Sequence, residues 1–307
     1  MSTGEITRPR AFFEIVDGSL RHYRQRFRAM VVLFVPMAIA QLVVGLIGGL
    51  MQIEGMKSAE DIDVGASMGY LGVAGLSWVL FSILYLIAYG GSIRLVAEDL
   101  LGRAMSASEA WRFGVRRFWP MVAIMIVVAL ALAIVIAPLL ALGIAAGPIG
   151  IVLALPIAIG LVVFLSLRLM LAYQVLLVED LDAGNALSRS WDLMRGNLLR
   201  GIALGIFLTL LVSVVTAPAS ILGMGWVFFI DENGEIQNHT AFWSLMGLSQ
   251  VLGAALQLVT APLTSMLWTH FYWDIRVRRE AFDLRSRLER VGGPPDPPSP
   301  PASTAST

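Results

Sequence analysis

Residues 29–50 read AMVVLFVPMAIAQLVVGLIGGL, a run of 22 residues without a charged side chain. A membrane helix needs about 20 apolar residues to cross roughly 30 Å of hydrocarbon. This run therefore predicts a transmembrane helix. Five more stretches meet the same condition, two of them with one arginine near the end: about 70–96, 119–142, 148–175, 201–223 and 242–273.

The composition agrees with a membrane protein. Of the 307 residues, 57% are hydrophobic and 14% are charged, and the mean hydropathy is +0.76. Soluble domains carry about 25% charged residues, so the chain is predicted to be an all-α integral membrane protein. The net charge is zero, which gives no indication of a nucleic-acid partner. Cysteine is absent, which excludes disulfides and cysteine-based metal sites, and we expect no cofactor.

Charge is distributed unevenly between the two sides of these six spans. Segments 1–28, 97–118, 176–200 and 274–307, with two arginines at span ends, contain every arginine of the chain. The opposite loops contain a single basic residue, Lys57, and seven acidic residues. Because cytoplasmic loops are enriched in basic residues, both termini are predicted to be cytoplasmic. The strong preference for arginine over lysine is typical of a G+C-rich genome, and we predict a bacterial cytoplasmic membrane.

The same patterns divide the chain into four parts. Residues 1–28 are predicted to be a cytoplasmic segment with an amphipathic helix, and residues 29–274 a six-span membrane domain. Residues 275–291 are predicted to form a basic cytoplasmic helix. Residues 292–307 are mostly Gly, Pro, Ser, Thr and Ala, so we expect a disordered tail.

The segments before the first, third and fifth spans resemble one another. Each has large apolar residues at helical spacing on one face and arginines elsewhere, which predicts three elbow helices, each followed by a hairpin of two spans. The three segments align without gaps on these residues: Ser19, Leu20 and Phe27; Ala110, Trp111 and Phe118; Ser190, Trp191 and Leu198. Trp111 and Trp191 are therefore predicted to occupy equivalent positions at the bilayer surface.

Two interpretations of the elbow residues remain open. Arginines such as Arg195, next to interfacial tryptophans, could bind anionic lipid phosphates, or they could only anchor the helices and set the topology. Arg168, inside the fourth span, could extend to the headgroups or pair with a phosphate or with a carboxylate such as Glu179, Asp180 or Asp274.

Asp274 and Arg276 begin a charged segment after the last span. Arg276 and Glu280 are four residues apart, so they can pair on a helix. We expect Asp274, at the membrane edge, to hold an arginine from a neighbouring elbow, such as Arg189 or Arg195.

Three segments carry a resemblance to a known family: Asp17–Phe27, Ala186–Asn197 and Phe271–Leu284. Together they resemble the glycerophosphoryl diester phosphodiesterase membrane-domain family. Some members fuse this membrane region to a catalytic domain, whereas stand-alone members are similar to this chain. The resemblance implies a membrane region without that catalytic domain. Ala281 stands where the closing motif of the family usually has glycine.

The sequence shows no catalytic constellation. A phosphodiesterase barrel needs roughly 250 residues, and only a short segment follows Asp274. His270 and Ser249 lie on one predicted helix about 31 Å apart, too far for a catalytic pair. We therefore expect no enzyme activity.

Three functions remain possible. The first is an accessory or scaffold domain that binds membrane lipids, anionic headgroups among them, or an unidentified protein partner at its cytoplasmic face. The second is a transporter or channel for a small or lipidic solute, and the third is a membrane module for a separately encoded phosphodiesterase. The most polar residues within the spans are Gln41, Gln250 and Gln257. A polar lining in mid-membrane favours transport, whereas a closed apolar bundle with a basic collar favours the first function.

Overall fold

A computed structural model describes residues 10–57, 64–229 and 238–292. These residues form helices joined by short turns and contain no strand. Their elements, in chain order, are α1 (Phe12–Lys57), α2 (Val64–Leu100), α3 (Ala107–Arg116), α4 (Phe118–Ala145), α5 (Gly147–Leu169), α6 (Ala172–Val178), α7 (Ala183–Met194), α8 (Leu198–Met224), the 3₁₀ turn η2 (Gly225–Phe229) and α9 (His239–Gly292). Six helical segments are long and apolar enough to cross a membrane.

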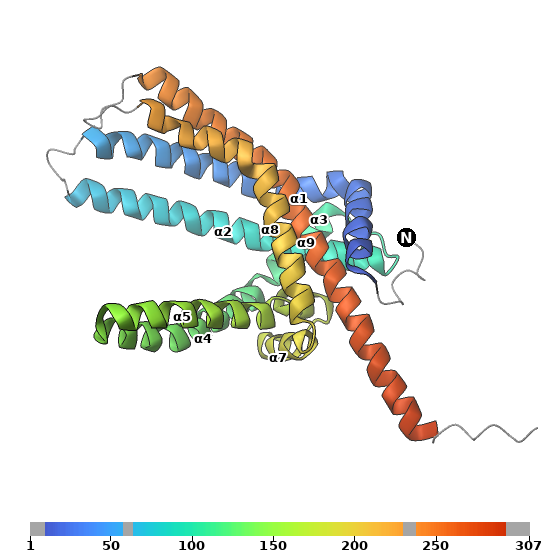
Figure 1. Ribbon diagram of the computed structural model, residues 1–307. Coiled ribbons are helices and arrows are strands. Elements are labelled where there is room, and N and C mark those ends of the chain that lie inside the picture. The colour runs from blue at the N-terminus through green and yellow to red at the C-terminus, as the bar shows by residue number, and fades with distance from the viewer. Residues whose placement is uncertain (1–9, 58–63, 230–237, 293–307) are drawn as a thin grey trace, which may run out of the picture.

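The long helices form two groups (Figure 1). α1, α2, α8 and α9 pack on one another and run in the same general direction. α4 and α5 form a separate hairpin that contacts the other group mainly near one end, where α3, α6 and α7 lie. The described chain also begins at this end, where the backbone of Arg10 contacts α9.

The α4–α5 hairpin is apolar but barely buried by the rest of the chain. Only 6% of the apolar window of α4 and 11% of that of α5 and α6 is buried. Its exposed residues include Ile134, Ile149 and Leu153. A helix with apolar residues on all sides is stable where its surroundings are apolar, so this hairpin is suited to lipid.

Three predicted boundaries differ from the structure. α1 continues without interruption past residue 28, although Figure 1 shows a marked bend that sets its first turns apart from the rest. α9 continues past Asp274, so the basic segment extends the sixth span. The predicted fourth span is divided, because α5 ends at Leu169 and the buried helix α6 follows as a separate element. Residues 293–307 lie outside the described part.

Local caps fix the two short helices that precede α4 and α8. At the start of α3, Ser106 and Glu109 form the capping box that their spacing predicts. The pKa of Glu109 is lowered, first by the hydrogen bond from the Ser106 backbone. Asp182 caps α7 by accepting from the backbone of Asn185, and hydrogen bonds from Asn185 lower the pKa of Asp182.

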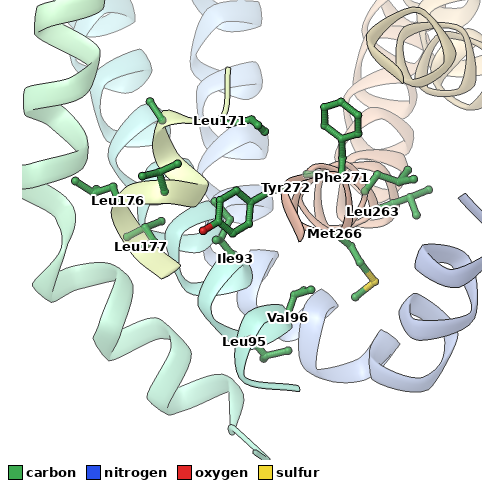
Figure 2. Close-up of a cluster of buried hydrophobic side chains, with 14 of the residues drawn as sticks. Ile93, Leu95, Val96, Leu171, Leu176, Leu177, Leu263, Met266, Phe271 and Tyr272 are labelled. Atoms are coloured by element: carbon green, nitrogen blue, oxygen red, sulfur yellow. The ribbon is translucent and has the colours of Figure 1, made fainter. Parts of the chain in front are cut away.

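A cluster of fully buried side chains lies where α2, α6 and α9 meet. Figure 2 shows Tyr272 of α9 directed toward α6, with Leu177 and Ile93 beside it. The hydroxyl of Tyr272 donates to Glu179 at 2.7 Å. Because α6 is fully packed while α4 and α5 are exposed, the rigid core lies at the end of the bundle that carries the charged residues.

Candidate functional site

Arginine–carboxylate pairs join the helices at this end, and we call them the arginine collar. Arg94 of α2 and Arg117, at the junction of α3 and α4, both reach Asp180, at 3.3 and 2.6 Å. Asp180 has a φ of 52°, a left-handed conformation that Asp tolerates better than most residues. The collar comprises Arg26, Arg94, Arg117, Arg189, Arg200 and Arg278 with Asp99, Glu179, Asp180, Asp274 and Glu280.

Asp274 is the most buried carboxylate of the collar, with a side chain that is 0% exposed. It accepts from the guanidinium groups of Arg200 and Arg278, both at 2.9 Å, and from the backbone N–H of Arg10 at 2.6 Å. The sequence predicted an elbow arginine as the partner of Asp274, and the partner is Arg200 rather than either of the two examples, Arg189 and Arg195. Arg200 lies in the first turn of α8, which packs along α9. Arg189 instead pairs with Glu179 and Glu280.

Arg168 makes no ion pair within the described residues, so of its three predicted alternatives the pairing with a carboxylate is not seen there. Its guanidinium stacks on Trp191 at 4.9 Å and on Phe164 at 5.3 Å, and it donates to the Trp191 carbonyl. Two aromatic faces and a carbonyl can stabilise a cation at the membrane edge without a carboxylate. Arg168 and Trp191 therefore form one unit that joins α5 to α7.

The other predicted residues take separate positions. Trp111 of α3 is half-buried against the core. Arg195 is exposed, and its carbonyl, rather than its side chain, accepts a hydrogen bond from Arg279. Arg276 pairs with Glu280 at 2.8 Å as predicted, and it also stacks on Trp273 at 5.3 Å. Among the predicted site residues, the structure thus brings Arg168 and Trp191 into contact with each other.

A polar cavity of about 530 Å³ lies among α1, α2, α8 and α9, and we call it the polar cleft. Gln41, Gln250 and Gln257, which stand out in the sequence as polar residues within spans, all line it. Hydroxyl residues complete the polar part of the lining: Tyr85, Thr216, Ser220, Ser249, Thr260 and Thr264. Among the described residues, the lining contains no Asp, Glu, Lys, Arg or His.

The cleft lies within the apolar part of the bundle, away from the collar. At 1.5 Å per residue, its residues on α9, from Thr264 to Gln250, lie about 15–36 Å along the helix from Asp274. Gly45 of α1 makes room for one of the amides, because a Cβ there would come within 2.7 Å of the Gln250 side chain. Gln41 has a buried Oε1 without a hydrogen-bond partner among the described residues. A buried polar atom in this state calls for a water molecule or a ligand.

A second cluster was not predicted from the sequence. His22 of α1 and His270 of α9 are within hydrogen-bond distance, and His22 also contacts Asp99 of α2. Both histidines are buried, at 4% and 2% exposure. No local spacing relates residues so far apart in the chain, so the only available signal was that the chain has just three histidines. The described residues contain no group of three or more metal-ligand side chains placed to hold an ion.

The fold and the cleft define a multi-pass α-helical membrane protein with an uncharged polar cavity. A family model matches residues 32–275, and the chain belongs to that family, which is described as a domain of unknown function (DUF7847). The matched range contains the cleft, Asp99, His270 and Asp274, but not His22. No curated protein matches the chain. No solved structure matches it either.

Proposed function

We propose that this protein is a non-enzymatic carrier or channel that takes a small or lipidic uncharged solute into the polar cleft. The convergence of Gln41, Gln250 and Gln257 on one cavity carries the proposal. Polar groups within a membrane bundle are expensive unless they are satisfied. Three amides at one place, one of them with an unpartnered oxygen, are therefore better explained by a bound polar group than by packing.

The chemistry of the lining selects the class of solute. Amides and hydroxyls both donate and accept hydrogen bonds, so they suit alcohol, amide or ester groups. A charged solute would lack a counter-ion, because the lining residues that the structure describes include no carboxylate, lysine, arginine or histidine. The lining also contains Val212, Ala219 and Ala261, which suit an apolar part of the same molecule. The expected solute is a neutral polar compound or a lipid with a neutral headgroup.

The substitution Gln250→Leu is expected to abolish retention of this solute. Leucine keeps the approximate volume but removes two hydrogen-bonding functions, and loss of a required hydrogen bond in a binding site costs about 1–3 kcal/mol, or roughly 5- to 150-fold in affinity. The protein would be purified in mild detergent, and its co-purifying small molecules and lipids measured by mass spectrometry. Arg116→Gln serves as the control, since Arg116 is exposed and distant in sequence from the cleft.

Two results would contradict the cleft as the binding site. One is an unchanged set of co-purifying neutral compounds in Gln250→Leu. The other is a wild-type protein that retains only anionic lipid, released by Arg116→Gln. A neutral compound that Gln250→Leu loses should next be tested for passage into proteoliposomes.

The second candidate is an accessory or scaffold domain that binds anionic lipid or a protein partner at the cytoplasmic face. The observation in its favour is that Arg24, Arg28 and Arg116 are exposed and form no ion pair among the described residues. Basic side chains at a membrane surface attract anionic headgroups. The six collar arginines, however, all bind carboxylates of the same chain, which leaves them less available for phosphates. The resemblance to the glycerophosphoryl diester phosphodiesterase membrane domains supports the third candidate, a module for a separate phosphodiesterase.

The proposed setting is a bacterial cytoplasmic membrane with both termini in the cytoplasm and three elbow-and-hairpin repeats. The collar is then cytoplasmic, in accord with the positive-inside rule. The short helices α3 and α7, each before a long helix, support the repeats. Leu20 lies on the first turns of α1, which are set apart by the bend.

This topology predicts the labelling of single cysteines in a chain that has none of its own. An impermeant thiol reagent added to intact spheroplasts should modify cysteines placed at Ser58 and Asn238. It should not modify cysteines placed at Ser106, Ser188 and Ser303 until the membrane is opened. Labelling at Ser188 in intact spheroplasts contradicts the proposed orientation.

A further inference from the structure

We infer that His22, His270 and Asp99 form a proton-binding relay that holds α1 against α9 and releases them when a second proton binds. The inference deepens the proposed function, because it identifies the proton as an ion that can be coupled to solute movement through the polar cleft. The coupling of proton binding to solute movement rests on the proposed function. The proton-dependent contact between α1 and α9 rests only on the contacts among His22, His270 and Asp99.

The relay joins three helices. Nδ1 of His22 lies 3.1 Å from Nε2 of His270, and Nε2 of His22 lies 3.3 Å from Oδ2 of Asp99. The two imidazole rings meet edge to face at 84°, with centroids 5.4 Å apart. The other carboxylate oxygen, Oδ1, accepts from Arg26. Each nitrogen of His22 thus faces one defined partner.

These contacts fit one proton on the pair but not two. With both rings neutral, His22 donates from Nε2 to Asp99 and accepts at Nδ1 from His270. One added proton makes His22 a donor at both nitrogens, and His270 can accept after changing its tautomer. A second proton places N–H against N–H, so the bond is lost and two cations repel each other in a buried position. The second proton therefore favours separation of α1 from α9.

A cavity large enough for water lies beside the relay. His22, Asp99 and Arg26 line a cavity of about 270 Å³, together with Gln25 and the turn that follows α2. The charged groups around the pair are Arg26, Asp99 and Arg103 at the cavity, Glu98 bound to Arg103, and Arg10 and Asp274 near His270. Arg94 also binds Glu98, and Arg200 and Arg278 bind Asp274, so arginines outnumber carboxylates around the pair and oppose a second positive charge there.

The helices that form the relay are those that line the cleft. α1 contributes Gln41 to the cleft, α2 contributes Tyr85, and α9 contributes Gln250, Gln257 and Thr260. Between the relay and the cleft, the hydroxyl of Tyr23 on α1 donates to the Val259 carbonyl on α9 at 2.9 Å. Separation of α1 from α9 at the histidines would open the collar end of this same helix pair, which is the motion a carrier needs to expose its site.

The test uses the full chain in lipid nanodiscs with ¹⁵N-labelled histidine. With only three histidines, each signal can be assigned by single substitution to Gln. The expected result is a coupled pair, in which His22 and His270 take up protons in two separate steps. In His270→Gln, His22 should titrate in a single step. His239→Gln, at the start of α9, is the matched control and should leave both steps unchanged. Independent single-step titration of the two rings would overturn the relay.

Opening is measured by the reactivity of buried thiols. Ser265 of α9 and Ser19 of α1 are both 0% exposed, and each would be replaced by Cys in a separate variant. Normalised to Arg24→Cys on the surface, their reactivity should rise about tenfold for each unit that the pH falls toward the second step and level off below it, since opening takes up one proton. In His270→Gln this rise should disappear. Reactivity that does not depend on pH in both variants would overturn the release.

The outcomes separate the two proposals. A pH-dependent opening that persists in Gln250→Leu, with no compound retained by the wild type, keeps the relay and rejects the solute function. Retention of a neutral compound with pH-independent thiol reactivity keeps the solute function and rejects the relay.

Discussion

The variant Asp274→Ala should unfold far more easily than the wild type. In the wild type the Asp274 side chain is fully buried and accepts hydrogen bonds from Arg200, Arg278 and the backbone of Arg10. Removal of one partner of a buried ion pair costs about 3–5 kcal/mol, because the remaining charges are left without compensation. The loss should also release the chain before α1, since Arg200 and Arg278 both donate to the Arg10 carbonyl as well.

The measurement is equilibrium unfolding in mixed detergent micelles. Asp17→Ala is the matched control: its carboxylate is 72% exposed and pairs with Arg21 on the same helix. An exposed pair of this kind contributes about 0.3–0.5 kcal/mol. Adding Arg200→Gln to Asp274→Ala should recover part of the loss, because one of the two stranded guanidinium groups is removed. Equal, small effects of Asp274→Ala and Asp17→Ala would show that the collar does not stabilise the fold.

Periodicity and hydropathy were sufficient to predict the six long helical segments. A span of apolar residues can satisfy its backbone in a membrane only as a helix, so the six helical segments follow from local sequence. The capping box at Ser106 is equally local, because it requires only a serine and a glutamate three residues apart. The break between α5 and α6 was missed because Met170 and Leu171 are as apolar as their neighbours.

Contacts between distant residues could not be predicted in the same way. Asp274 was expected to bind an arginine from an elbow, and it binds Arg200. The particular arginine could not be predicted, because the choice among Arg189, Arg195 and Arg200 depends on how α7 and α8 lie against α9. Each of the three glutamines of the cleft could be identified in the sequence as a polar residue within a span. Their position around one cavity, however, depends on the packing of α1 against α9. The same packing brings His22 to His270.

The crossing of α2 and α3 gives the last prediction, since here the backbones themselves are in contact. A Cβ on Gly91 would lie 2.6 Å from the carbonyl oxygen of Ala110, and one on Gly114 would collide with the carbonyl of Ile87. Neither carbonyl belongs to a flexible side chain that could move aside. Gly114→Ala should therefore force the helices apart and destabilise the protein by about 2–3 kcal/mol, despite the better helix propensity of alanine.

Gly205→Ala is the control that separates this contact from the general effect of glycine. Nothing lies within 4 Å of a Cβ on Gly205, which is inside α8. There the change should stabilise the helix by about 0.5–1 kcal/mol, because alanine has less backbone freedom to lose on folding. The two alanine variants should thus shift the unfolding midpoint in opposite directions. A stabilised Gly114→Ala would mean that α2 and α3 do not cross with their backbones in contact, and the position of α3 against the bundle would have to be redrawn.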